Sequence, residues 1–139
     1  ATEVFDARGL TVLPGCIDTQ THFREPGSTD TEDLHSGSRA AIVGGITSVF
    51  DMPNTNPPTS TKVEFQKKLD LAKNRMYCNY AFYFGATADN ASELADLVNL
   101  EGCCGSKLFA GSSTGNLLVA EEEDIEKVFQ SSSKVVAVH

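Results

Sequence analysis

Polar side chains alternate along an extended segment near the start of the chain. Residues 17–27 carry Asp18, Gln20, His22 and Arg24, each two positions after the last. Side chains two residues apart in a strand lie on one face, so these four are predicted to point the same way. An imidazole and a guanidinium one step apart suit an anionic ligand close to a metal ion. On spacing alone, a polar strand edge with a hydrogen-bonded histidine remains the alternative.

A lysine lies within the predicted strand at residues 106–109. Lys107 is followed directly by Leu108 and Phe109. Such a lysine either points to solvent or projects into the interior, where desolvation removes its proton readily. A neutral amine can react with carbon dioxide to give a carbamate, an anionic oxygen ligand that can bridge two metal ions. Lys107 is therefore a candidate for this chemistry, with a solvent-facing side chain as the alternative.

Two more polar residues follow predicted strands. Asn54 lies in the segment 51–58, whose prolines cannot continue a hydrogen-bonded strand. His139 follows the apolar run 135–138. On this pattern alone, a rigid loop is the favoured interpretation of 51–58. The position of His139 at the end of a strand favours a site, although a disordered end would give the same pattern.

Strand-like and helical patterns alternate along the chain. Strands are predicted at 10–13, 16–22, 46–52, 76–84, 106–109 and 134–139, and helices at 31–43, 61–74, 91–100 and 119–130. Thr29, Thr61 and Asn90 each precede a glutamate by three residues, as at helix starts. The helix over 61–74 is predicted to lie on the surface, with Lys67 and Lys68 among its polar residues.

This alternation predicts parallel strands joined by right-handed helical crossovers. A closed (β/α)₈ TIM barrel takes about 250 residues, whereas this chain has 139. We therefore expect the N-terminal part of such a barrel, with about its first five strands, in an incomplete chain. A complete open α/β sheet of five strands is the alternative, but no predicted helix covers its last strand.

Charge and hydropathy exclude several classes of function. Eleven lysines and arginines stand against 19 aspartates and glutamates, which gives a net charge of −8. So acidic a chain argues against nucleic-acid binding and against an anionic membrane surface. No apolar run reaches the ~18–20 residues of a membrane helix, and no signal peptide is recognisable. We expect a cytoplasmic protein.

Several short motifs together resemble one family. They are PGCID at 14–18, FREPG at 23–27, GGIT at 44–47, DMPNT at 51–55, KLF at 107–109 and VAVH at 136–139. In this order, over nearly the whole chain, they resemble dihydroorotases of the cyclic amidohydrolase superfamily. Allantoinases and hydantoinases share the first motif, but they differ around Arg24 and typically lack Pro-Asn-Thr after the second strand.

The resemblance implies a fold and a reaction. The family fold is an amidohydrolase-type (β/α)₈ barrel, often with a small β-sandwich built from both ends of the chain. Residues 1–13 would lead out of that sandwich, and residues 14–139 would form the N-terminal part of the barrel. The reaction interconverts dihydroorotate and N-carbamoyl-L-aspartate in pyrimidine biosynthesis. We expect one or two zinc ions, this small-molecule substrate and a homodimer.

The resemblance also implies roles for single residues. His22 corresponds to the second histidine of the zinc-binding His-x-His motif, and His139 to a ligand of the second metal. Lys107 corresponds to the carboxylated lysine that bridges the metals. Arg24 and Asn54 correspond to the groups that hold the substrate carboxylate.

One position departs from the family pattern. Gln20 stands where the first histidine of the metal motif is expected. An amide oxygen is a weaker zinc ligand than an imidazole. The protein therefore uses one zinc, binds two loosely, or is a non-catalytic relative.

Overall fold

A computed structural model describes residues 2–113 and 115–139. It contains a five-stranded parallel sheet in the order β1-β2-β3-β4-β5. The strands are β1 (Cys16–Thr21), β2 (Ile46–Asp51), β3 (Asn79–Gly85), β4 (Cys103–Leu108) and β5 (Val136–Val138). Because the strand order follows the sequence order, each crossover moves one place along the sheet, as in the first part of a TIM barrel.

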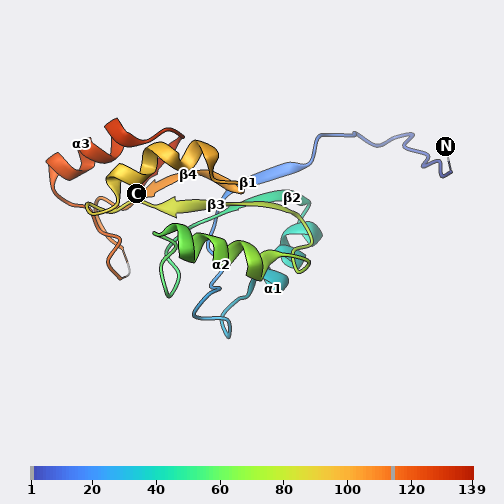
Figure 1. Ribbon diagram of the computed structural model, residues 1–139. Coiled ribbons are helices and arrows are strands. Elements are labelled where there is room, and N and C mark those ends of the chain that lie inside the picture. The colour runs from blue at the N-terminus through green and yellow to red at the C-terminus, as the bar shows by residue number, and fades with distance from the viewer. Residues whose placement is uncertain (1, 114) are drawn as a thin grey trace.

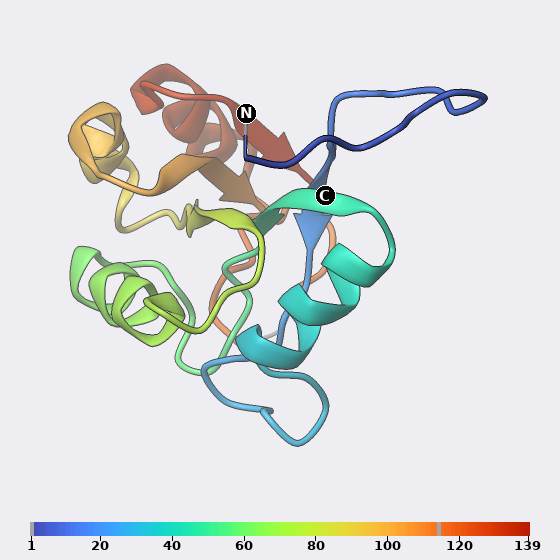
Figure 2. The ribbon, with the colours of Figure 1, turned by 90° about the vertical axis from the view of Figure 1, so that its right-hand side faces the viewer.

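The helices lie between the strands in sequence and around the outer side of the curled sheet in space (Figures 1 and 2). They are α1 (Leu34–Val43), α2 (Lys62–Ala72), the 3₁₀ helix η1 (Ala91–Asn99) and α3 (Glu122–Ser131). The sheet and its helices form half of a barrel, which confirms the predicted fold class. In the described part of the chain, no helix is long and apolar enough to cross a membrane.

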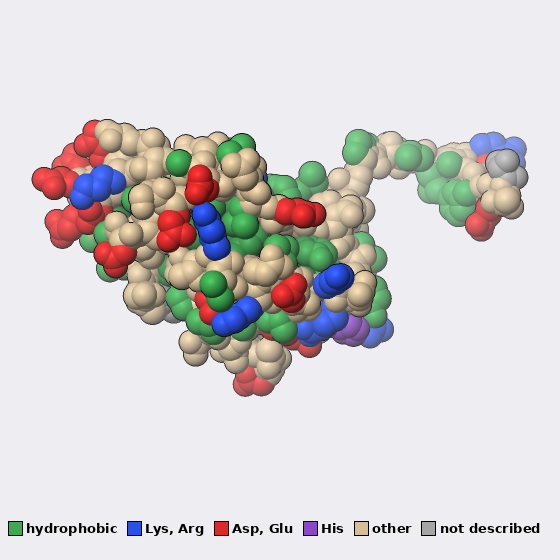
Figure 3. Space-filling view, viewed as in Figure 1, with side chains coloured by type: hydrophobic (Ala, Val, Ile, Leu, Met, Phe, Trp, Pro, Cys, Tyr) green, Lys and Arg blue, Asp and Glu red, His purple; other side chains and the backbone are tan. Residues whose placement is uncertain are grey.

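The prediction of a strand at 10–13 is wrong. Residues 2–15 form an extended, largely exposed arm that leaves the sheet, and within the described residues it pairs with no strand (Figure 1). Several of its apolar side chains face solvent (Figure 3), namely Val4, Phe5, Leu10, Val12 and Leu13. The apolar pattern there reflects side chains without a packing partner in this part of the chain.

Helix α1 starts later than the pattern at Thr29 predicts. Its N-cap is Asp33, whose carboxylate accepts a hydrogen bond of 2.6 Å from the Ser36 amide, and the Ser36 hydroxyl bonds back to the Asp33 amide. Glu25 also accepts a hydrogen bond from the amide of Leu34, the first helical residue. This long-range acceptor fixes the helix start, so the Thr29–Glu32 capping box does not form.

The other two predicted helix starts differ from each other. Thr61 caps α2 as predicted, with its hydroxyl accepting from the Glu64 amide at 3.1 Å. Asn90 precedes η1 but does not cap it. Its side-chain amide instead donates to the carbonyls of Ser60 and Gly85, so the side chain joins the loop before η1 to the loop at Ser60. The helix that follows is a 3₁₀ helix.

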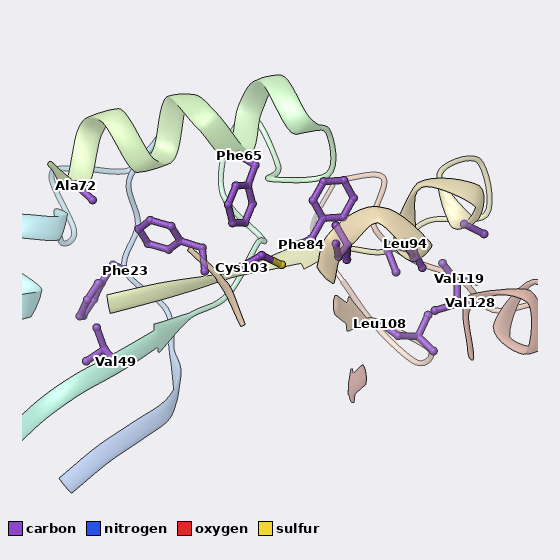
Figure 4. Close-up of a cluster of buried hydrophobic side chains, with 14 of the residues drawn as sticks. Phe23, Val49, Phe65, Ala72, Phe84, Leu94, Cys103, Leu108, Val119 and Val128 are labelled. Atoms are coloured by element: carbon purple, nitrogen blue, oxygen red, sulfur yellow. The ribbon is translucent and has the colours of Figure 1, made fainter. Parts of the chain in front are cut away.

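The apolar core lies between the sheet and the helices, with phenylalanines at its centre (Figure 4). Phe65 of α2 is fully buried, and its ring centroid lies 6.3 Å from those of both Phe82 and Phe84 on β3. These contacts hold α2 against the middle of the sheet. Strand β3, which follows α2, and the loop that precedes α2 are thereby fixed relative to each other.

Truncating this central ring is expected to destabilise the fold. Phe65→Ala should lower the free energy of unfolding by about 3–5 kcal/mol, because it removes apolar contacts and leaves a cavity. The matched control is Val63→Ala on the same helix, where 63% of Val63 is exposed and a change within about 0.5 kcal/mol is expected. Urea denaturation measures both, and equal effects would contradict the central role of Phe65.

Candidate functional site

The predicted site residues gather at one end of the sheet. His22 directly follows β1, Asn54 follows β2, Lys107 is the penultimate residue of β4, and His139 directly follows β5. All strands are parallel, so these positions share the carboxyl edge of the sheet. In α/β barrels this edge carries the active site.

A hydrogen bond joins His22 to Asn54. Nδ1 of His22 lies 2.9 Å from Oδ1 of Asn54, and both side chains are half-buried. A carbonyl oxygen can only accept, so Nδ1 carries a proton, and in the neutral form of the ring Nε2 keeps the lone pair. The bond therefore orients His22 with Nε2 free to bind a metal ion, and it leaves the amide NH₂ of Asn54 free to donate.

A cavity of about 350 Å³ opens beside this pair. Arg24 and Asn54 both line it. Within residues 2–113 and 115–139, Arg24 forms no ion pair with a carboxylate. The cavity thus offers a half-buried guanidinium and an amide to an anion. Its other lining residues are Pro26, Ser28, Thr55, Asn56, Pro58 and Gly115.

Two loops that carry this cavity are locked together. The Asn56 amide donates to the Pro26 carbonyl at 3.0 Å. Gly27 has a φ of 118°, and a Cβ there would lie 2.9 Å from atoms of Asn56, so only glycine allows the loops to approach this closely. The Thr55 hydroxyl donates to the Pro57 carbonyl at 2.8 Å. These contacts hold the walls of the cavity in place without a ligand.

Lys107 is buried. Only 2% of it is exposed, and no carboxylate pairs with its ammonium in the described ranges. Burial therefore lowers the pKa of Lys107 from its ordinary value. Its Nζ lies 4.9 Å from the ring centroid of Phe109. A lowered pKa increases the neutral amine fraction, which is the form that reacts with carbon dioxide.

His139 lies near the same aromatic ring. Its ring centroid is 6.1 Å from that of Phe109, and its amide donates to the Leu108 carbonyl at 3.0 Å. Phe109 therefore contacts both Lys107 and His139, and within the described residues no hydrogen bond joins those two side chains. The exposed side chain of His139 remains accessible at the end of β5.

Gln20 is separate from these groups. Its side chain is exposed and makes no hydrogen bond to any described residue, while its backbone amide donates to Asp18 Oδ1 at 3.0 Å. The structure thus brings His22, Asn54 and Arg24 together, and it links Lys107 with His139 through Phe109. Gln20 joins neither group.

Residues 11–137 match the model of the amidohydrolase family. The chain belongs to the amidohydrolase family. Among curated relatives, it is 38% identical over 135 residues to a dihydroorotase of Methanosarcina mazei, covering 97% of this chain and 29% of that protein. It is 43% identical over 89 residues to an allantoinase of Saccharomyces cerevisiae, covering 63% of this chain and 19% of the relative.

Solved structures agree with this membership in the amidohydrolase family. The L-hydantoinase of Arthrobacter aurescens superposes with a TM-score of 0.80 at 28% identity, over 91% of this chain and 29% of that chain. An inactive dihydroorotase-like domain of Chaetomium thermophilum has the same fold, with a TM-score of 0.73 at 20% identity over 91% of this chain and 37% of its own. This amidohydrolase chain spans less than two fifths of each of these relatives.

The donors for a metal ion are only partly present in this amidohydrolase chain. No group of three or more His, Cys, Asp or Glu side chains that could hold a metal occurs in the part that the structure describes. His22 nevertheless has an oriented Nε2, and Lys107 is a buried lysine with no counter-ion among the described residues. Each of these two residues fits the role of one metal ligand, but together they do not make a complete set.

The prediction that Lys68 lies on the surface of α2 is wrong. Lys68 is fully buried and forms an ion pair of 2.6 Å with Asp51, also fully buried, at the end of β2. A signal was present in the sequence, because position 68 is three after Phe65 and four before Ala72, both of which are buried. The partner Asp51 could not be assigned from that spacing.

A second ion pair was also missed. Arg75 binds both carboxylate oxygens of Glu25, at 2.7 and 3.0 Å, and one of these oxygens also accepts the Leu34 amide. The pair raises the pKa of Arg75, mainly through its hydrogen bonds to Glu25. Because Glu25 directly follows Arg24, this network anchors the loop that carries the cavity-lining guanidinium.

Proposed function

We propose that this chain is part of a metal-dependent dihydroorotase, which hydrolyses the cyclic amide of dihydroorotate reversibly to N-carbamoyl-L-aspartate. The cavity that Arg24 and Asn54 line beside His22 is the observation that carries this proposal. Dihydroorotate has a carboxylate next to its ring, and a guanidinium offers a two-pronged set of donors to such a group.

The residues around the cavity have separable tasks in this reaction. Arg24 binds the carboxylate, and the NH₂ group of Asn54 donates to it because Oδ1 is already used by His22. The Asn54–His22 bond thus couples the bound carboxylate to the histidine that faces the metal. The substrate is held by one end, so its ring amide is presented to the carboxyl edge of the sheet.

Zinc is the metal that we propose, as one or two ions held by His22, His139 and a carboxylated Lys107. When bound, zinc supplies Lewis-acid activation of the ring carbonyl and of water. In the carboxylation, the neutral amine of Lys107 forms an N–C bond with carbon dioxide and releases one proton. The burial that lowers the pKa of Lys107 supports this step.

Two rival functions have specific support. The allantoinase and hydantoinase relatives favour another cyclic amide as the substrate. Gln20 in place of a histidine favours a non-catalytic dihydroorotase-like protein. Arg24 favours dihydroorotate over allantoin as the substrate, because allantoin has no carboxylate for a guanidinium to bind.

A substrate panel tests the proposed function. The full-length protein, purified with zinc present, should hydrolyse dihydroorotate and leave allantoin and hydantoin nearly unchanged. Faster hydrolysis of allantoin or hydantoin than of dihydroorotate would overturn the proposal and favour an allantoinase or hydantoinase. A folded protein that retains no zinc and turns over none of the three would instead be the non-catalytic relative.

Gln20 provides a direct test of the metal centre. Gln20→His should add about one zinc ion per chain, because an imidazole is a stronger zinc ligand than an amide oxygen. Zinc per full-length chain is measured by elemental analysis before and after the substitution, with activity kept or raised. Unchanged zinc content would mean that position 20 is not a ligand position.

The remaining proposals concern the protein as a whole. We propose that it acts in pyrimidine biosynthesis in the cytoplasm, as a homodimer, and that residues 1–13 lead from a small β-sandwich into the barrel. The exposed apolar side chains of the arm support the last point, since they need a partner surface.

A further inference from the structure

A fully buried ion pair contacts the backbone segments that lead into the cavity loops. Nζ of Lys68, on α2, is 2.6 Å from Oδ2 of Asp51, at the end of β2, and neither side chain has any exposed surface. Asp51 Oδ2 has no other hydrogen-bond partner within the described residues, so Lys68 is its sole counterpart there. Removing two charges from water is costly, and such a pair is weak evidence for added stability.

The carboxylate holds the segment that carries His22 and Arg24. Oδ1 of Asp51 accepts a hydrogen bond of 2.7 Å from the backbone amide of Phe23, the residue between them. It also lies 3.1 Å from the hydroxyl of Thr21. Because successive side chains of an extended segment point to opposite sides, fixing the Phe23 amide fixes the directions of both neighbours.

The ammonium holds the segment that leads to Asn54. Nζ of Lys68 donates to the Met52 carbonyl at 2.9 Å, two residues before Asn54. It also lies 4.8 Å from the ring centroid of Phe82, on β3. A single buried pair therefore contacts the backbone on both sides of the His22–Asn54 hydrogen bond.

We propose that Asp51 and Lys68 are positioning residues for the anion cavity: together they set the backbone that carries Arg24 and His22 against the backbone that carries Asn54. This inference rests on the proposed function, since it takes a carboxylate as the ligand. An apolar pair of similar volume could pack α2 against β2 equally well. It could neither accept the Phe23 amide nor donate to the Met52 carbonyl.

Two double variants separate positioning from packing. Asp51→Leu with Lys68→Met replaces the pair by two apolar side chains, the one at position 51 larger than aspartate, and removes both backbone contacts. Asp51→Asn with Lys68→Met retains an acceptor for the Phe23 amide and loses the ion pair together with the Lys68 contacts to Met52 and Phe82. A matched control is Lys62→Met with Asp96→Asn, which removes an exposed pair of 3.1 Å that begins on the same helix.

The measurement is the affinity of the chelator-treated, full-length protein for N-carbamoyl-L-aspartate, by titration calorimetry, alongside the melting temperature. The Leu/Met variant should bind at least about tenfold more weakly, the Asn/Met variant about threefold more weakly, and the control like the wild type. The melting temperatures of both pair variants should fall, because each leaves a buried backbone group unpaired, so the affinities are compared at a temperature at which every variant is folded. In the zinc-loaded enzyme, KM should rise more than kcat falls.

Affinities equal to the wild type in both folded variants would overturn the inference and leave the proposed function standing. Should the Leu/Met variant not fold, the Asn/Met variant decides alone, and an unchanged affinity overturns the inference. Should the wild type itself bind no N-carbamoyl-L-aspartate, the proposed function fails instead. Hydrogen exchange at the Phe23 amide then decides positioning, which requires faster exchange in the Leu/Met variant than in the Asn/Met variant and the control.

Discussion

Lys107→Ala is expected to lower kcat of the full-length enzyme by about three orders of magnitude. The substitution removes the amine that would carry the carbamate, and metal-centred charge stabilisation contributes several kcal/mol to such reactions. Lys107 is buried with no carboxylate partner in the described structure, so removing it leaves no orphaned counter-charge. A large loss of rate with a retained fold is therefore the expected result, measured by dihydroorotate turnover and circular dichroism.

Rescue identifies the chemical role of this lysine. Short carboxylic acids such as acetate or propionate should restore part of the activity of Lys107→Ala, because each supplies a carboxylate where the carbamate would be. The control is Lys127→Ala on α3, an exposed lysine paired with Asp124, which should keep full activity and show no response to the acids. A Lys107→Ala enzyme with wild-type activity would refute the role.

Arg24→Lys is expected to raise KM for dihydroorotate by about tenfold or more, with a smaller change in kcat. A lysine keeps the charge but loses the planar pair of donors that matches a carboxylate. Hydrogen bonds to charged groups are worth about 1.5–3 kcal/mol, which corresponds to a tenfold to hundredfold loss of affinity. Arg24→Leu removes the charge as well and should raise KM further.

Steady-state kinetics measures both variants against a matched control. Arg39→Lys changes an exposed arginine on α1 in the same way and should leave KM unchanged. Unchanged kinetics in Arg24→Lys would separate Arg24 from the carboxylate. A fall in kcat at constant KM would give it a role in the chemical step instead.

Much of the candidate site could be predicted from residue types at the ends of strands. His22, Asn54 and His139 follow predicted strands and Lys107 lies within one, and the structure places all four at one edge of a parallel sheet. Local spacing was sufficient for their common edge, because parallel strands align their carboxyl ends, but only the resemblance to dihydroorotases singled out Asn54. The proposed zinc and carbamate roles of these residues remain predictions.

The sequence by itself determined the order of strands and helices and the start of α2 at Thr61, because both depend on groups within a few residues of one another. Only the tertiary structure decided that Lys68 is buried rather than solvated, and that Asn90 joins two loops instead of capping η1. It alone also paired His22 with Asn54. In each case the partner is distant in the chain, and the free energy of burying or orienting a polar group depends on that partner.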